Sequence, residues 1–306
     1  MPFEVKQLEY NRLHGLGPRL LGRSLASLTR DSRRTILEDA PPDLTISTGH
    51  RSVPVVRALR HRSGGRTRSI HVGFPRVSPS HFDLVIATPQ YPIADHPNLL
   101  RIPYALTRAA TEHANAEQRS DRTGLPASRR LLIVGGPTLY WNLDDSVLLR
   151  TLGQMLDEAA ADGGSVLVTT SPRTPAPLAL QIASMLETSK VPTLFARPGH
   201  QPPYASLLAA ADSIRVTADS VSMLSDAIWT GKPAAVVPIA KSPLGDIAFE
   251  LNDRLRPGSR IYPQDLRFFW RALADIGISD QLALPRTSTN EVMAAVTARI
   301  SSILIG

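Results

Sequence analysis

The chain has 306 residues, 42% apolar and 20% charged, which is the composition of an ordinary globular protein and a suitable length for two domains. No run approaches the roughly 18–20 apolar residues of a membrane-spanning helix, and the N-terminus lacks the apolar core of a secretory signal. The absence of cysteine excludes disulfides, thiolate catalysis and Cys-ligated zinc. Together these features predict a cytoplasmic protein.

The net charge of +7 is concentrated in the first part of the chain. Residues 1–130 carry 20 basic and 11 acidic side chains, whereas residues 131–306 carry 14 and 16. This basic part is either a solvated surface or the attachment site of an anionic partner, such as a phospholipid surface or a phosphate-bearing acceptor. Nucleic acid is the least favoured partner, because aromatic residues are only 5% and no binding motif is found. The oligomeric state stays open.

The first part of the chain alternates apolar runs typical of strands with segments typical of helices. Between Leu13 and Arg34, leucines interleave with arginines, as in an amphipathic helix that packs on its own sheet or lies in a membrane interface. A doubly wound domain normally opens with a strand, a Gly-rich turn and a helix, and here no such turn follows the first predicted strand. We therefore expect this domain either to lack its opening strand–helix unit or to be permuted. The predicted strands are Phe3–Tyr10, Leu44–Ser47, Ser69–Phe74, Leu84–Ala87 and Leu99–Ile102, with a helix over Ser52–Arg62.

The same alternation resumes after a polar stretch at residues 108–129, which we interpret as a linker. Repeated strand–helix alternation is typical of parallel sheets covered by helices on both faces. The sequence therefore predicts an α/β protein with two doubly wound domains, at 1–107 and 130–286, and a closing helical segment at 287–306. The predicted strands are Leu131–Val134, Ser165–Thr169, Thr193–Ala196, Ile214–Thr217 and Ala234–Pro238, and the helices are Asp145–Ala161, Pro177–Thr188, Pro203–Ala211, Ser220–Thr230 and Ser288–Leu304.

Polar and glycine residues follow several predicted strands of the second domain. Ligands of an open parallel sheet bind at the carboxyl ends of its strands, where helix N-termini present free N–H groups. A plain turn or an N-cap explains parts of this pattern equally well, but not all of it. The candidate ligand-binding residues, suited to phosphate and ribose groups, are Gly135, Gly136, Thr138, Thr170, Ser171, Arg173, Asp219, Ser220, Ser222, Met223 and Asp226; the resemblance described below implies that their ligand is a nucleotide sugar.

Strand ends of the first domain carry a second set of candidates, which we expect on the opposite wall of a cleft between the domains; the resemblance described below implies that this wall is the acceptor side. The general base is not identified by any motif, and His71 and Asp95 are the candidates for it. No metal-ligand spacing, Walker loop or nucleophile elbow is present, so no metal site is predicted. The acceptor-side candidates are Thr48, Gly49, Arg51, Ser52, Arg76, Gln90 and Tyr91.

These motifs resemble those of the mitochondrial-fission ELM family, whose bacterial members are regarded as candidate GT-B glycosyltransferases. The resemblance covers nearly the whole chain, and the segment from Val216 to Met223 that leads into Gly231–Pro233 is its most distinctive part. The other segments are Asp43–Pro54, His71–Arg76, Phe82–Tyr91, Val134–Pro137, and Val168–Ser171 with Arg173–Pro175.

The resemblance implies two Rossmann-like domains that face a cleft, with the closing helix crossing back to the N-terminal domain. It implies that Gly135, Gly136 and Thr138 approach the diphosphate or the nucleotide. Ser220, Ser222 and Met223 would then meet the phosphates, and Asp226 would bind the ribose. Two residues depart from the family pattern, because Asp226 stands where Glu is usual and His50 stands where a second Arg is expected beside Arg51.

Three functions follow from this resemblance. The first is metal-independent transfer of a sugar from a nucleotide-diphosphate donor to a membrane-linked or lipooligosaccharide-type acceptor, by a protein that is peripheral on the inner face of the membrane. No tightly bound cofactor is expected, and the nucleotide sugar is the substrate. The alternatives are a nucleotide-sugar epimerase on the same fold and a non-catalytic scaffold, since eukaryotic relatives are linked to organelle division.

Overall fold

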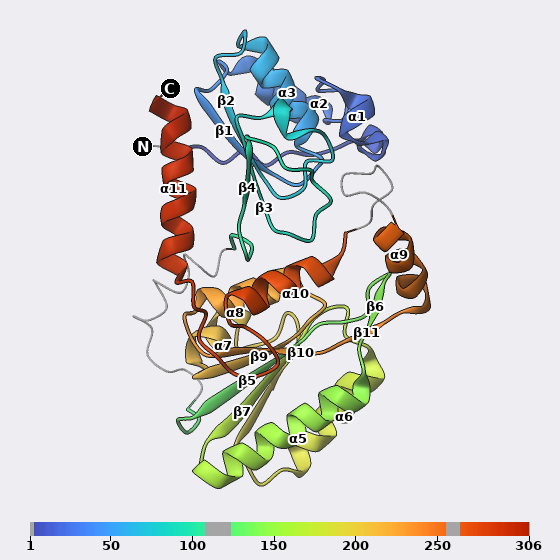
Figure 1. Cartoon of the computed structure of the whole chain (residues 1–306), viewed down its shortest axis with the longest axis vertical. Helices are drawn as coiled ribbons and strands as arrows, with labels where there is room; N and C mark the ends of the chain where they lie inside the picture. Colours follow the sequence, from blue (N-terminus) through green and yellow to red (C-terminus); the bar gives the residue numbers. More distant parts are fainter. Residues whose placement is uncertain (1–2, 108–123, 255–263, 306) are drawn as a thin grey trace. The chain divides into compact units, whose positions relative to one another are not determined.

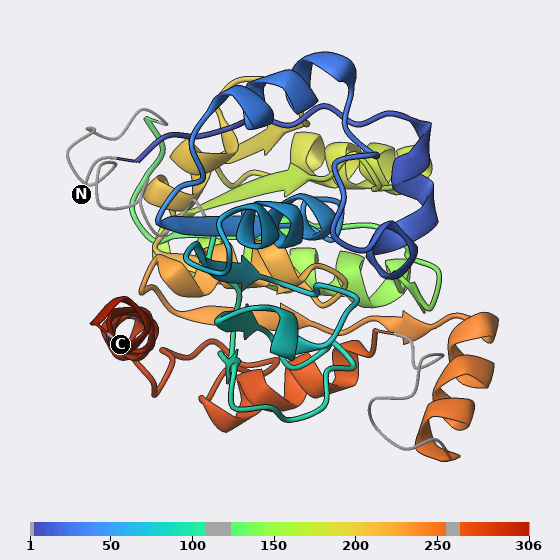
Figure 2. The ribbon, with the colours of Figure 1, turned by 90° about the horizontal axis from the view of Figure 1, so that it is seen from above.

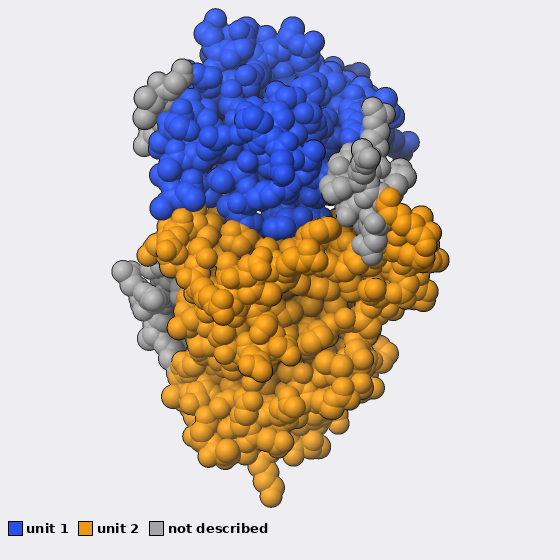
Figure 3. Space-filling view, viewed as in Figure 1, with its two compact units in different colours: residues 1–102, 293–306 blue, residues 103–292 orange. Residues whose placement is uncertain are grey.

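The structure is a computed structural model that describes residues 3–107, 124–254 and 264–305. The chain forms two compact units, coloured in Figure 3: unit 1 comprises Met1–Ile102 with Met293–Gly306, and unit 2 comprises Pro103–Val292. Most of the predicted linker, residues 108–123, lies outside the described residues. Over the described ranges, no helix is both long enough and apolar enough to cross a membrane.

Unit 1 is built on a parallel sheet whose four strands follow the chain in the order β1-β2-β3-β4 (Figure 1). Its central strands are almost entirely buried, as is usual for parallel sheets covered by helices. The predicted strands from Leu44 onward and the predicted helix over Ser52–Arg62 are confirmed. The elements are η1 (Arg12–Leu16), α1 (Gly17–Leu21), α2 (Arg30–Glu38), β1 (Leu44–Thr48), α3 (Val53–Arg62), β2 (Arg68–Val72), η2 (Pro79–His81), β3 (Leu84–Ala87) and β4 (Leu99–Arg101).

The first 34 residues differ from the prediction in two ways. Residues 3–10 are not a strand, because Tyr10 makes only an isolated antiparallel bridge to Leu28. The predicted helix over Leu13–Arg34 is also wrong, since the chain is interrupted at Gly17 and Gly22, which have φ values of 72° and 60°. Such positive φ values suit glycine and end a helix, so η1 and α1 stay short and α2 begins separately at Arg30.

Unit 2 contains a parallel sheet with the strand order β10-β9-β5-β7-β8. This order is that of a doubly wound sheet: the chain moves outward from β5 and then returns to place β9 on its other side. A small antiparallel pair, β6 with β11, lies outside this sheet. The elements are β5 (Arg129–Val134), β6 (Trp141–Asn142), α5 (Asp145–Asp162), β7 (Ser165–Thr170), α6 (Ala176–Thr188), β8 (Thr193–Ala196), α7 (Tyr204–Ala210), β9 (Ser213–Thr217), α8 (Val221–Trp229), β10 (Ala234–Val237), β11 (Ala240–Lys241), α9 (Pro243–Arg254) and α10 (Leu266–Asp275).

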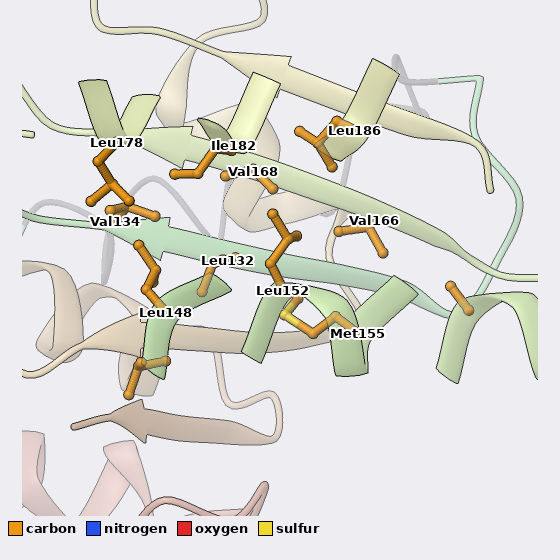
Figure 4. Close-up of a cluster of buried hydrophobic side chains, with 12 residues drawn as sticks. Leu132, Val134, Leu148, Leu152, Met155, Val166, Val168, Leu178, Ile182 and Leu186 are labelled. Atoms are coloured by element: carbon orange, nitrogen blue, oxygen red, sulfur yellow. The ribbon is translucent and has the colours of Figure 1, made fainter. Parts of the chain in front are cut away.

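One face of the unit 2 sheet packs against α5 and α6 (Figure 4). Leucines and a methionine of α5 and apolar residues of α6 recur every three or four positions, so each helix turns one apolar face to the strands. Each fully buried side chain of this kind contributes about 1.5–3 kcal/mol, so this core holds the strand ends in fixed positions. The strands supply Leu132, Val134, Val166 and Val168, and the helices supply Leu148, Leu152, Met155, Leu178, Ile182 and Leu186.

The last helix, α11 (Thr289–Ile305), confirms the predicted closing helix. Ser288 and Glu291 form a capping box: the Glu291 amide lies 3.2 Å from the Ser288 hydroxyl, and the Ser288 amide donates to the Glu291 carboxylate over 2.7 Å. From Met293 onward this helix belongs to unit 1, where Arg299 donates to the Pro97 carbonyl. The prediction of two Rossmann-like α/β units with parallel sheets is therefore confirmed, and the chain reversal of a doubly wound sheet is found in unit 2.

Candidate functional site

The strand order of unit 2 creates a switch point between β5 and β9. Connections leave these two neighbouring strands in opposite directions, so a crevice opens at their carboxyl ends, where such sheets bind ligands. Gly135 and Gly136 follow β5, and Asp219 follows β9. Residues more than 80 positions apart in the sequence thereby meet at one edge of the sheet.

Five residues at this edge form a closed set of hydrogen bonds, which we call the Asp219 cluster: Gly135, Gly136, Arg173, Thr217 and Asp219. The Asp219 side chain is 1% exposed and accepts from the Gly136 amide (3.1 Å), the Thr217 hydroxyl (2.6 Å) and the Arg173 guanidinium (2.6 Å). The Gly135 amide donates to the Thr217 hydroxyl oxygen over 2.8 Å. Both glycine amides that were expected to approach a phosphate are therefore already paired within the protein.

Close packing explains why both positions are glycine. A Cβ atom at Gly135 would lie 2.2 Å from each carboxylate oxygen of Asp219. A Cβ atom at Gly136 would lie 2.2 Å from the Arg173 carbonyl oxygen. Both distances are far below van der Waals contact, so any side chain there would push the cluster apart.

Arg173 is the part of the Asp219 cluster that solvent reaches. Its side chain is 43% exposed, and its guanidinium also donates to the Gly136 carbonyl over 2.7 Å. These contacts, with a third to the Pro137 carbonyl over 3.3 Å, hold the guanidinium in the loop that follows β7. A guanidinium fixed in this way can pair with a phosphate at low entropic cost.

A pocket of about 540 Å³ lies beside the cluster, at the carboxyl ends of β5, β7 and β8. Thr170 and Ser171, predicted as site residues, line it from the end of β7, and Met223 lines it from the first turn of α8. Its opposite wall is the loop of residues 197–203, together with Tyr204 at the start of α7. The sequence analysis did not predict this wall. A loop that contains Arg, His and three prolines between a predicted strand and a predicted helix could have indicated a ligand-binding loop.

Tyr204 connects the pocket to the predicted ribose residue. Its hydroxyl donates to the Asp226 carboxylate over 3.2 Å. Burial first, and then the neighbouring Asp226 charge, raise the pKa of Tyr204, so the phenol remains a neutral donor. Asp226 is half-buried and lies one helical turn beyond Met223, on the same side of α8. The carboxylate is therefore held next to the pocket.

The remaining predicted residues of unit 2 have local roles. The Ser220 hydroxyl caps α8 by accepting from the Met223 amide over 3.3 Å, and Ser222 is exposed in the first turn. Thr138 lies outside the pocket lining, where its amide donates to the Trp141 carbonyl over 2.8 Å and shapes the turn before β6. The structure thus brings Thr170, Ser171 and Met223 together in the pocket.

The acceptor-side candidates of unit 1 gather at the ends of β1, β2 and β3. The Ser52 hydroxyl lies 3.0 and 2.8 Å from the carbonyl oxygens of Thr48 and Gly49 and closes the turn into α3, and Thr48 itself is exposed. Arg51 and Arg76 are both exposed, and Arg76 has a φ of 57°, a left-handed conformation that is uncommon for a non-glycine residue. These two arginines therefore give the edge a positive charge.

Three residues of unit 1 are less accessible. Gln90 is 2% exposed, and the half-buried Tyr91 stacks on Phe74 with ring centroids 5.5 Å apart. His71 is 0% exposed, with its Nδ1 atom 3.0 Å from the Ser47 hydroxyl. This burial argues against His71 as a general base, because the imidazole has no path to a substrate.

The other candidate base, Asp95, is on the surface. Its side chain is 97% exposed and pairs with Arg101 over 3.2 Å. Within the parts of the chain that the structure describes, no group of three or more His, Asp or Glu side chains is arranged to hold a metal ion.

Two Rossmann-like α/β units, the second with a ligand edge at the switch point of its sheet, are the features of the GT-B fold. The family model described as "Mitochondrial fission ELM1" matches residues 1–247, and the chain belongs to this family.

One curated relative is the mitochondrial fission protein ELM1 of Arabidopsis thaliana, which is 27% identical over 248 residues. The match covers 71% of this chain and 56% of the relative, so the chain spans about half the length of that protein. Among solved structures, a candidate UDP-N-acetylglucosamine 2-epimerase of Listeria monocytogenes superposes with a TM-score of 0.50 at 13% identity, covering 92% of this chain and 81% of that one. The UDP-GlcNAc 2-epimerase of Methanocaldococcus jannaschii gives a TM-score of 0.49 at 10% identity, covering 92% and 84%.

Proposed function

We propose that unit 2 binds a nucleotide-diphosphate sugar and that the protein transfers the sugar to an acceptor. The observation that carries this proposal is the pocket of about 540 Å³ at the switch-point edge of the sheet, with the Tyr204–Asp226 pair beside it. Its size suits a nucleotide, and a carboxylate held next to it is an acceptor for the two hydroxyls of a ribose.

Each part of a nucleotide sugar has a matching group in this proposal. The loop of residues 197–203 faces the base, and Asp226 accepts from the ribose hydroxyls while Tyr204 keeps its carboxylate in position. The diphosphate lies at the first turn of α8, where the helix dipole and the backbone amides favour a negative charge. Arg173 supplies the positive charge from the Asp219 cluster.

The chemical step follows from these positions. As an acceptor hydroxyl oxygen bonds to the anomeric carbon and its proton passes to water, the bond from that carbon to the diphosphate breaks. Negative charge develops on the oxygen atoms of the leaving diphosphate, and a fixed guanidinium and a helix N-terminus stabilise this charge. We assign this role to Arg173 and α8, so the transfer is proposed to proceed without a metal ion. The acceptor is proposed to be membrane-linked or of the lipooligosaccharide type and to bind at Thr48, Gly49, Arg51, Ser52 and Arg76.

A thermal-shift screen against UDP, GDP, CMP, dTDP and their sugars tests the nucleotide site. A ligand that binds only the folded protein stabilises it by about 2.7 kcal/mol at a hundredfold excess over its Kd. We expect one nucleotide class to raise the melting temperature of the wild type and of the control Asp157→Ala, which removes an exposed carboxylate of α5. The shift should be lost in Asp226→Ala. Equal shifts in both variants would contradict the role of Asp226.

Two other functions make different predictions. The solved structures that share the fold include a candidate UDP-N-acetylglucosamine 2-epimerase, and an epimerase would convert the donor sugar with no acceptor present. Product analysis after incubation with the donor alone distinguishes this case. A non-catalytic scaffold, in keeping with the name of the Arabidopsis relative, would bind no nucleotide although unit 2 is folded.

A further inference from the structure

Three leucines near the N-terminus are exposed although leucine favours the core. Leu13, Leu16 and Leu20, in η1 and α1, are 45%, 51% and 79% exposed. By contrast Leu28, from the same stretch, is 1% exposed and packs against α3. Gly22, which ends α1, therefore separates these three leucines, which face solvent, from Leu28, which joins the core of unit 1.

Arginines, and no acidic residues, lie beside these leucines in the sequence. Residues 10–30 include four arginines and no aspartate or glutamate. Arg12, Arg19 and Arg23 are exposed, and in the described parts of the chain no carboxylate forms an ion pair with them. We call Leu13, Leu16 and Leu20 with Arg12, Arg19 and Arg23 the η1–α1 surface.

The positive charge extends from this surface into its surroundings. Burial first, and then the charge of Arg23, lower the pKa of Arg57, a residue of α3, the helix against which α1 packs (Figures 1 and 2). The pKa of His81 is lowered by burial and then by Arg57 and Arg23. Like charges gathered in this way repel one another, so an anionic partner would relieve an existing repulsion.

A hydrogen bond connects the η1–α1 surface to the ligand edge of the unit 1 sheet. The Arg19 Nε atom donates to the Arg76 carbonyl oxygen over 3.1 Å, which joins α1 to the loop after β2. His50, at the end of β1, lies close enough to His14, Arg51 and Arg76 for their charges, after burial, to lower its pKa. The exposed leucines therefore adjoin the residues to which the acceptor was assigned.

We propose that the η1–α1 surface docks on an anionic phospholipid bilayer, with the leucines inserted among the acyl chains and the arginines at the headgroup phosphates. Exposed leucines next to exposed arginines match an anionic bilayer, which has an apolar interior and negatively charged headgroups. Docking there would present a lipid-linked acceptor to Arg51 and Arg76. This last step rests on the proposed function, whereas bilayer binding is measured without any sugar donor.

Co-sedimentation with vesicles containing equal parts of phosphatidylglycerol and phosphatidylcholine tests the docking. We expect the wild type to bind, and the double variant Leu16→Glu/Leu20→Glu to lose at least about tenfold in partition coefficient. Arg23→Gln should lose roughly fivefold, because one arginine near an anionic membrane contributes about that factor. The controls are Leu180→Glu, at a 62% exposed leucine of α6, and Arg150→Gln, at an exposed arginine of α5, and both should bind like the wild type.

Several results would overturn the proposal. These are no binding of the wild type, equal binding by the double variant and the wild type, and equal binding to vesicles of phosphatidylcholine alone. Sedimentation velocity without lipid tests whether a second copy of the chain occupies the surface instead. A wild-type dimer that becomes a monomer in the double variant would assign the η1–α1 surface to that second copy. Far-ultraviolet circular dichroism verifies that each variant is folded, so that lost binding is not lost structure.

Discussion

The buried imidazole of His71 gives unit 1 a stability that depends on pH. Its Nδ1 atom lies 3.0 Å from the Ser47 hydroxyl, its ring packs 5.3 Å from that of Phe82, and its Nε2 atom has no hydrogen-bond partner among the described residues. A charged imidazole would carry a proton on both nitrogen atoms, and its Nε2–H group would be buried without an acceptor. Burial first, and then the nearby His50, lower the pKa of His71 from its ordinary value of 6.5 to about 4.

The size and the sign of the effect follow from linkage between protonation and folding. Below pH 6.5 the His71 imidazole of the unfolded chain binds a proton, whereas in the folded chain it stays neutral until the pH approaches 4. Stability is therefore complete above the unfolded pKa and declines as the pH falls toward the folded pKa, by about 3 kcal/mol in total and about 2 kcal/mol by pH ~5. For a domain of this size, 2 kcal/mol lowers a urea midpoint by about 1 M.

Urea unfolding at several pH values, followed by far-ultraviolet circular dichroism, measures this decline. Tryptophan fluorescence recorded in parallel reports on unit 2, because Trp141, Trp229 and Trp270 all lie there. The variant His71→Asn keeps a polar atom near Ser47 but cannot titrate, so its midpoint should fall less between pH ~6.5 and ~5. His61→Gln, at an exposed position of α3, is the matched control and should follow the wild type. If wild type and His71→Asn have the same dependence on pH, the reasoning is refuted.

Two further predictions concern unit 2. Gly135→Ala should destabilise the protein by about 3 kcal/mol, because its Cβ atom would displace the Asp219 carboxylate. The same change at Gly153 of α5, where a Cβ atom meets no neighbour, should stabilise the protein by up to about 1 kcal/mol. Thermal unfolding measures both changes, and a shift of the melting temperature in the same direction for both variants would contradict the close-packing argument. Tyr204→Phe should lower the free energy of unfolding by about 1 kcal/mol, because the hydrogen bond to Asp226 is lost. It should also weaken the binding of the nucleotide identified by the thermal-shift screen, as measured by calorimetry. Unchanged affinity would exclude Tyr204 from the site.

The sequence was sufficient for the order and the type of the main elements. Strands such as those ending at Val134 and Thr217, and helices such as α5 and α11, carry periodic apolar patterns that depend only on neighbours along the chain. The α/β class and the two units with parallel sheets followed from this alternation. The prediction for the first 34 residues was wrong because their leucine spacing is compatible with one helix, whereas the positive φ values at Gly17 and Gly22 divide that stretch.

The candidate site was predictable only as a set of strand ends. Polar residues after β5, β7 and β9 were recognisable, but the sequence does not say which atoms those residues contact. It assigned Gly135 and Gly136 to phosphate, whereas the sheet order brings Asp219 and Thr217 against them and pairs their amides internally. The loop of residues 197–203 was missed for a related reason, since its place in the pocket depends on how β8 lies beside β7.

By itself, then, the sequence determined where most strands and helices from Leu44 onward lie, and that the basic charge lies in its first part, because both are properties of neighbouring residues. Only the tertiary structure decided which leucines of residues 13–28 are exposed, that His71 is buried, and that Asp219 is the centre of a hydrogen-bonded cluster. The physical reason is the same in each case. Burial and hydrogen bonding depend on contacts between segments far apart in sequence, and the order of strands in a sheet creates those contacts.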